Sequence, residues 1–118
     1  ISGRFDGIQL NICLNYGGRN EILRAVKLIA SECMSGNLAP EELTEDDISS
    51  RLYSAGIPDP DLIIRSGGEM RISNFLLWQS AYSEFYVTDT LWPDFDKKEM
   101  IKAISSYQKR DRRFGGVK

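Results

Sequence analysis

The sequence predicts an α/β fold in which helices flank a parallel sheet. Two successions support this prediction: an alternating segment at 8–14 that leads through a glycine turn into a helix, and an apolar run at 62–64 followed by a glycine pair. Strand, turn and helix in repeated order are typical of parallel sheets with helices on their faces. Ligands of such sheets bind beyond the carboxyl ends of the strands, which is where both glycine turns fall.

The first half of the chain contains a predicted strand and two predicted helices. Residues 8–14 alternate apolar and polar side chains at period two, which favours a strand. Residues 19–35 have apolar side chains at helical spacing and end at Gly36, a common helix stop. The side chains expected on the inner face are Ile22, Ala25, Val26, Ile29, Ala30 and Cys33. Thr44, followed by acidic residues, begins a short helix that extends to about Tyr53.

The second half contains two more strands and two more helices. Residues 62–64 form a short apolar run that predicts a buried strand ending on Arg65. Residues 73–81 are apolar enough for a short buried helix, and residues 85–88 predict another strand. Residues 96–99 have the composition of a capping box, which predicts the start of a final helix.

Composition places the chain among soluble globular proteins of one domain. It has 118 residues, of which 42% are hydrophobic and 27% charged, as in ordinary globular domains. The formal net charge of −2 argues against a nucleic-acid partner, which needs a surplus of basic residues. No apolar run approaches the ~20 residues that span a bilayer, and no signal segment opens the chain, so we expect a cytoplasmic setting. Because the sequence has no histidine, histidine-based triads are excluded within this chain.

Two arginines and a serine surround the glycine pair that follows the second predicted strand. Arg65 ends that strand, and Arg71 and Ser73 follow the glycines at 67–68. Guanidinium forks hold phosphate oxygens in fixed directions, and glycine lets backbone N–H groups turn toward a bound anion. This group predicts a phosphate or diphosphate site at the carboxyl edge of the sheet. The alternative is that the arginines pair with surface carboxylates.

Four other polar residues are candidate parts of a site. Glu69 and Glu84 are either carboxylates for a magnesium ion bound with a diphosphate or solvated surface residues. Asn15 is best explained as support for the first glycine turn. Arg19 either belongs to the same connection or points at an anion near the start of the helix.

Five segments of the sequence together resemble one known family. They are Asn-Tyr-Gly-Gly-Arg at 15–19, the block at 59–75, the aromatic-rich stretch at 76–86, Leu-Trp-Pro-Asp-Phe at 91–95 and Arg-Arg-Phe-Gly-Gly at 112–116. These segments closely resemble the cis-prenyltransferases, with bacterial undecaprenyl diphosphate synthase as the nearest member. The likeness covers nearly the whole chain and is most specific between residues 59 and 95.

The resemblance implies a homodimeric enzyme that uses Mg²⁺ to condense isopentenyl diphosphate onto farnesyl diphosphate, repeatedly and in cis. Its product would be a long polyprenyl diphosphate that dissolves in membrane lipid, so peripheral contact with the membrane is also expected. By motif match, four residues would bind the diphosphate of isopentenyl diphosphate: Arg65, Arg71, Ser73 and, through its backbone, Ile72. Glu84 matches the family's magnesium-associated carboxylate. Arg113 and Gly115 match its terminal motif, which reaches toward phosphate across the dimer.

Two departures from the family pattern limit what this chain is expected to do. The resemblance implies that residues 1–118 are the C-terminal portion of a single domain, inactive alone because the N-terminal half carries the catalytic aspartate. Met70 stands where many bacterial relatives have histidine, and methionine is neither a general base nor a ligand for hard cations. Two alternatives stay open: a non-catalytic partner subunit of the same fold, and an unrelated phosphate-binding module.

Overall fold

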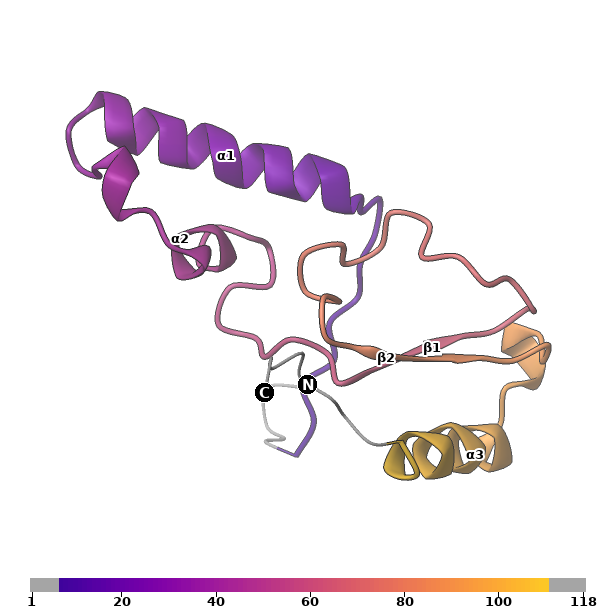
Figure 1. Ribbon diagram of the computed structural model, residues 1–118. Helices are drawn as coiled ribbons and strands as arrows, with labels where there is room; N and C mark the ends of the chain where they lie inside the picture. Colours follow the sequence, from indigo (N-terminus) through magenta and orange to yellow (C-terminus); the bar gives the residue numbers. More distant parts are fainter. Residues whose placement is uncertain (1–6, 111–118) are drawn as a thin grey trace.

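The computed structural model describes residues 7–110, which form three α-helices and two β-strands (Figure 1). In chain order these are α1 (Gly18–Met34), α2 (Glu45–Ser49), β1 (Leu62–Arg65), β2 (Glu84–Val87) and α3 (Lys97–Gln108). Short 3₁₀ turns at Pro40–Glu42 and Trp92–Asp94 precede α2 and α3. Helix α1 packs against α2, and α3 packs against β2 on the other side of the molecule (Figure 1). None of the helices between residues 7 and 110 is long and apolar enough to cross a bilayer.

The two strands pair in parallel, as the sequence predicts. Leu62 lies opposite Glu84, and Arg65 lies opposite Val87. The ladder continues beyond the strand end, where the N–H of Thr88 donates to the carbonyl of Arg65 at 2.9 Å. Parallel strands need a long crossover connection, and residues 66–83 supply it. The predictions of a strand ending on Arg65 and of a second strand near 85–88 are therefore confirmed.

The predicted strand at 8–14 is wrong for the residues that the structure describes. This segment has no ladder partner among residues 7–110, and Ile8 and Leu14 are 91% and 83% exposed. A strand exists only where its N–H and C=O groups pair with a neighbouring strand. Alternating side chains predict which face would be buried, but they do not supply that neighbour.

The predicted helix at 73–81 is also wrong, because this stretch consists of turns. Ser73, Asn74 and Leu76 have φ angles of +50°, +63° and +45°. An α-helix requires φ near −63°, and non-glycine residues seldom adopt positive values. The crossover from β1 to β2 is therefore irregular, and it is this loop that carries the residues discussed below.

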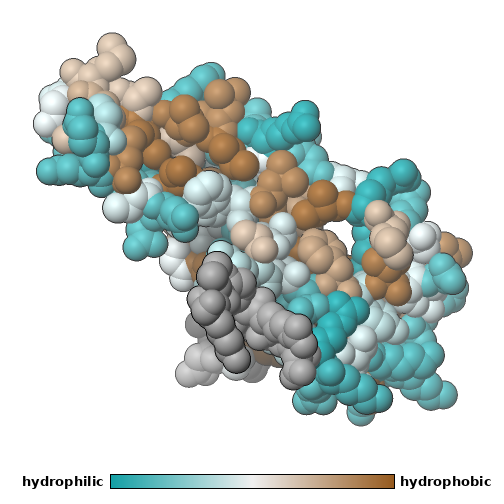
Figure 2. Space-filling view, in the orientation of Figure 1, coloured by the Kyte–Doolittle hydropathy of each residue, from teal (hydrophilic) through white to brown (hydrophobic). Residues whose placement is uncertain are grey.

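Helix α1 is confirmed within one residue at each end, but only part of its predicted inner face is covered. Ala25 and Ile29 are buried, whereas Val26 is 48% exposed. Figure 2 shows hydrophobic side chains gathered along this helix. The contacts of α1 with α2 and, at Gly18, with the turns near Leu77 leave Val26 exposed.

The two remaining helices begin where the sequence predicts. The Thr44 N–H donates to the Asp47 carboxylate at 2.9 Å at the start of α2, which ends at Ser49 and so is shorter than expected. The Asp96 carboxylate accepts from the N–H groups of Lys98 and Glu99 at the start of α3. Side-chain oxygens at these positions satisfy N–H groups that have no partner within the helix.

Gly18 lies where the start of α1 meets the crossover loop. Its N–H donates to the Asn74 carbonyl at 2.7 Å, and a Cβ at this position would lie 2.8 Å from the Leu77 Cγ atom. Replacing Gly18 by alanine would improve helix propensity, but the methyl group has no room. Overpacking of this kind destabilises by about 1–3 kcal/mol.

We therefore expect Gly18→Ala to lower the free energy of unfolding of the complete protein, measured by denaturant titration. Gly7→Ala is a matched control, because a Cβ at Gly7 would meet no atom within 4 Å. A Gly18→Ala variant as stable as the unmodified protein would show that the close approach to Leu77 does not constrain the loop.

Candidate functional site

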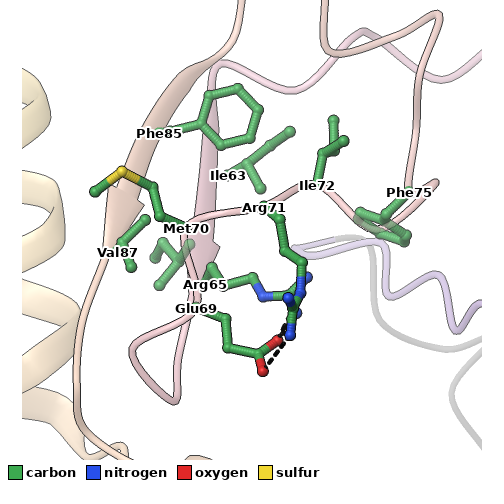
Figure 3. A pocket seen from close by; sticks show the side chains of 10 residues that line it. Ile63, Arg65, Glu69, Met70, Arg71, Ile72, Phe75, Phe85 and Val87 are labelled. Atoms are coloured by element: carbon green, nitrogen blue, oxygen red, sulfur yellow. Dashed lines mark hydrogen bonds and ion pairs between the residues drawn. The ribbon is translucent and has the colours of Figure 1, made fainter.

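The side chains of Arg65 and Arg71 converge on one carboxylate, that of Glu69 (Figure 3). Arg65 Nη2 lies 2.9 Å from Glu69 Oε2, and Arg71 Nη2 lies 2.5 Å from Glu69 Oε1. Arg71 Nε also donates to Glu69 Oε2 at 3.0 Å. The structure thus brings the two arginines together at the carboxyl end of β1, as predicted, and places an acidic side chain between them.

This arrangement combines both interpretations of the arginines. They do pair with a surface carboxylate, since the Glu69 side chain is 48% exposed, but both pair with the same one. The hydrogen bonds and charge of Arg71, and then those of Arg65, hold the pKa of Glu69 below its usual range. Glu69 therefore stays ionised, and the two guanidiniums keep a common anionic partner.

A cavity of about 320 Å³ lies directly beside this ion-pair cluster. Its wall is largely apolar, and Figure 3 shows the contributing side chains on β1, the loop and β2. The apolar lining consists of Ile63, Ile64, Met70, Ile72, Phe75, Phe85 and Val87. A ligand with a short hydrocarbon group and an anionic head matches such a cavity, because the hydrocarbon contacts the wall while the head meets the guanidiniums.

The glycine pair has a different role from the one expected. Both N–H groups are used within the protein: Gly67 donates to the Thr90 carbonyl and Gly68 to the Thr88 carbonyl, each at 2.9 Å. They therefore do not turn toward an anion. Gly68 has φ +74°, and a Cβ there would lie 2.7 Å from Asp89 Oδ1. The pair reverses the chain tightly, which returns Glu69 and Arg71 to the end of β1.

Ile72 and Ser73 are placed differently from each other. Ile72 lines the cavity, and its carbonyl accepts from the Phe75 N–H at 3.1 Å. Ser73 is exposed and is not among the residues that line the cavity. The predicted grouping therefore holds for the arginines and Ile72, whereas Ser73 lies beside it. Binding of a diphosphate by these residues stays a prediction.

Glu84 lies at the opposite end of the strands from Arg65. It begins β2 opposite Leu62, three residues before Val87, which pairs with Arg65; that separation is about 10 Å along a strand. Its carboxylate pairs with Arg110, whose Nη1 lies 2.6 Å from Glu84 Oε2. Residues 7–110 contain no group of three or more acidic, cysteine or histidine side chains suited to a metal ion. The predicted residues Arg113 and Gly115 lie outside the described residues.

The start of α1 is held by Asn74, which the sequence analysis missed. The Arg19 N–H donates to Asn74 Oδ1 at 2.9 Å, and the Gly18 N–H donates to the Asn74 carbonyl. These N–H groups therefore serve the crossover loop, which argues against an anion site at this helix end. Asparagine tolerates positive φ well, so its place among apolar residues was the one available sign of a turn.

A buried glutamate, also missed, joins three segments behind the site. Glu21 is 1% exposed and accepts hydrogen bonds from the Tyr53 N–H at 2.7 Å, from Gln79 Nε2 at 3.2 Å and from the Tyr16 hydroxyl. Burial, and then the hydrogen bond to Glu21, raises the pKa of Tyr16. The available signal was an acidic residue next to the apolar face of α1. Its hydrogen bonds link α1, the segment after α2 and the turns before β2.

Comparison with known proteins identifies relatives along nearly the whole chain. Residues 2–115 match the family described as "Putative undecaprenyl diphosphate synthase". An isoprenyl transferase of Heliobacterium mobile is 62% identical over 111 residues, which are 94% of this chain and 43% of that protein. An isoprenyl transferase of Geobacillus kaustophilus is 58% identical over the same shares of each chain. The chain thus spans less than half the length of these relatives.

Solved structures of related proteins also match this chain. The crystal structure of lavandulyl diphosphate synthase from Lavandula x intermedia, in complex with dimethylallyl diphosphate, matches with a TM-score of 0.84 at 41% identity. A probable undecaprenyl diphosphate synthase from Campylobacter jejuni matches with a TM-score of 0.69 at 38% identity. The matches cover 87% of this chain and 44% and 45% of those two chains. An unrelated phosphate-binding module is therefore excluded, and the chain belongs to the undecaprenyl diphosphate synthase family.

Proposed function

We propose that the protein carrying this chain condenses isopentenyl diphosphate onto an allylic diphosphate, such as farnesyl diphosphate, in cis and repeatedly. In this proposal the present chain supplies the isopentenyl diphosphate site. The observation that supports it best is the cavity at the end of β1, where Arg65 and Arg71 meet beside an apolar wall. An isopentenyl group has the chemistry of that wall, and a diphosphate is the natural partner of two guanidiniums.

The proposed reaction needs positioning more than it needs acid–base chemistry from this chain. The allylic diphosphate loses its diphosphate group, the double bond of isopentenyl diphosphate forms a new carbon–carbon bond to the cationic carbon, and a proton then leaves. Arg65 and Arg71 would hold the acceptor diphosphate while Ile63 and Phe85 would contact its hydrocarbon group. Fixing the acceptor in this way brings its double bond within reach of the reacting carbon.

The described residues by themselves do not form a magnesium site. Glu84 is paired with Arg110, and Glu69 is paired with both arginines. Neither glutamate belongs to a group of three or more acidic, cysteine or histidine side chains among the described residues. We therefore assign no step to a metal within this chain. Dependence of the complete enzyme on Mg²⁺ stays part of the proposal, with Glu84 as one carboxylate ligand. Because Glu84 lies at the other end of the strands from Arg65, that ion would lie apart from the diphosphate held by the two arginines.

The role of Glu84 leads to a prediction about magnesium titrations. We expect EDTA to abolish product formation, and we expect Glu84→Gln to raise the Mg²⁺ concentration at half-maximal rate, since one anionic oxygen ligand is lost. Glu42→Gln, on the exposed 3₁₀ turn before α2, is the control and should leave the titration unchanged. An unaltered Mg²⁺ requirement in Glu84→Gln would remove Glu84 from the metal site.

We also propose that the protein is cytoplasmic and that it forms a homodimer. The molar mass measured by light scattering tests the dimer. Two large aromatic side chains are exposed in this chain: Tyr82 is 72% exposed and Trp92 is 75% exposed. Trp92 stacks on Phe95 with ring centroids 5.9 Å apart. Exposed aromatic residues are enriched at protein interfaces, which supports this part of the proposal.

The direct test is incubation of the complete protein with farnesyl diphosphate, labelled isopentenyl diphosphate and Mg²⁺, followed by sizing of the labelled products. We expect labelled polyprenyl diphosphates. The alternative of a non-catalytic partner subunit predicts no incorporation by the protein alone and stimulation of an active subunit when the two are mixed. That alternative is less favoured, because a partner without its own acceptor site has no need for Arg65 and Arg71 beside an apolar cavity.

A further inference from the structure

Glu69 lies at the point toward which both guanidiniums of the site are directed (Figure 3). Three nitrogen donors on two side chains hold its two oxygens: Arg65 Nη2, Arg71 Nη2 and Arg71 Nε, at 2.9, 2.5 and 3.0 Å. One carboxylate oxygen bridges the two arginines, and the other completes a two-point contact with Arg71. These are the contacts that guanidiniums also make with the oxygens of a phosphate group.

The loop holds the backbone of Glu69 close to the two arginines and leaves its side chain partly exposed. The glycines before Glu69 are anchored by hydrogen bonds to Thr88 and Thr90, so the backbone keeps Glu69 close to the end of β1. Its side chain is 48% exposed, and a released carboxylate would therefore be hydrated rather than buried without a partner. Ion pairs at such exposure are individually weak. A stronger anion with more oxygens can replace Glu69 at the two arginines.

We propose that Glu69 is an internal substitute for the diphosphate. Without ligand it holds Arg65 and Arg71 together at the mouth of the cavity, and an incoming diphosphate displaces it. This inference rests on the proposed function, since it takes the same cavity as the diphosphate site. Competition by Glu69 lowers the affinity for every anion that has to displace it, and by the same factor, because the ion pairs broken are the same whichever anion enters.

The test is the binding of inorganic diphosphate and inorganic phosphate to the complete protein by isothermal titration calorimetry. Glu69→Gln keeps the shape of the side chain and removes its charge. We expect it to lower the dissociation constant for diphosphate about threefold to tenfold, the range that loss of two weak ion pairs implies. The dissociation constant for phosphate should fall by a similar factor, since both anions displace the same carboxylate. Glu69→Ala should change both quantities in the same direction, and it provides a second variant if the glutamine variant does not fold.

Glu32→Gln is the matched control. Glu32 also pairs with an arginine through two contacts, those of Arg51 Nε at 3.2 Å and of Arg51 Nη2, but it lies on α1 and not at the cavity. The Glu32→Gln substitution changes the net charge by the same amount as Glu69→Gln. Because it lies away from the cavity, it should leave anion binding unaltered.

The outcomes separate this inference from the proposed function. If Arg65→Ala weakens diphosphate binding but neither Glu69 variant strengthens it, Glu69 does not compete and this inference alone fails. Weaker binding in the Glu69 variants overturns it too, since that result makes Glu69 a support for the bound state. If Arg65→Ala leaves diphosphate binding unchanged, the cavity is not the diphosphate site, and both the site assignment and this inference fail.

Discussion

Arg65→Ala in the complete enzyme is expected to raise the KM for isopentenyl diphosphate and to lower kcat/KM by about tenfold to a hundredfold. The estimate follows from loss of one charge-assisted contact, worth about 1.5–3 kcal/mol. Arg65 is the better placed of the two arginines, because β1 holds its backbone and its side chain is only 30% exposed. The measurement is the initial rate of labelled isopentenyl diphosphate incorporation, with the allylic primer saturating.

Two further variants show what a changed rate means. Arg65→Lys keeps the charge but loses the planar fork, so its kcat/KM should fall between those of the original enzyme and Arg65→Ala. Arg24→Ala removes an arginine that stacks over Tyr53 at 4.9 Å, away from the cavity, and its KM should stay unchanged. If Arg65→Ala keeps both KM and kcat, the diphosphate binds elsewhere.

Glu21→Ala is expected to lower the free energy of unfolding of the complete protein by about 2–4 kcal/mol. The side chain is fully enclosed and accepts hydrogen bonds from Tyr53, Gln79 and Tyr16. Its removal leaves buried donors without a partner and opens a cavity, and each of these changes destabilises. The measurement is denaturant unfolding followed by circular dichroism.

The matched variants are Glu21→Gln and Glu41→Ala. The glutamine keeps an acceptor for the Tyr53 N–H, so its effect should be the smaller of the two at this position. Glu41 is exposed on the 3₁₀ turn before α2, and its replacement should change the unfolding free energy by less than about 0.5 kcal/mol. If Glu21→Ala unfolds at the same denaturant concentration as the original protein, the buried hydrogen bonds make no net contribution to the free energy of unfolding.

The elements that the sequence predicted correctly are those whose signals are local. Helix α1 was found within one residue at each end, since periodicity and Gly36 are properties of adjacent residues. The strand ending on Arg65 and the cap at Asp96 were found for the same reason. The site was predicted in part: the arginines meet as expected, whereas the glycine N–H groups bind Thr88 and Thr90 rather than facing an anion.

The elements that it missed depend on partners distant in the chain. Residues 8–14 have strand-like alternation but no ladder partner among residues 7–110, and residues 73–81 are apolar but adopt positive φ angles at Ser73 and Asn74. Asn74 lies 55 positions from Arg19, whose N–H it binds. Neither hydrophobic spacing nor helix propensity contains information about such a contact.

By itself, the sequence determined the family, the parallel α/β class and the identity of the two arginines, because motifs and periodicity are written in neighbouring residues. Only the tertiary structure decided that Glu69 lies between those arginines and that Glu84 lies at the other end of the strands, paired with Arg110. It also decided that Glu21 is buried. Charges attract whichever opposite charges the folded backbone brings within reach, and that distance is set by the path of the chain rather than by the spacing of its residues.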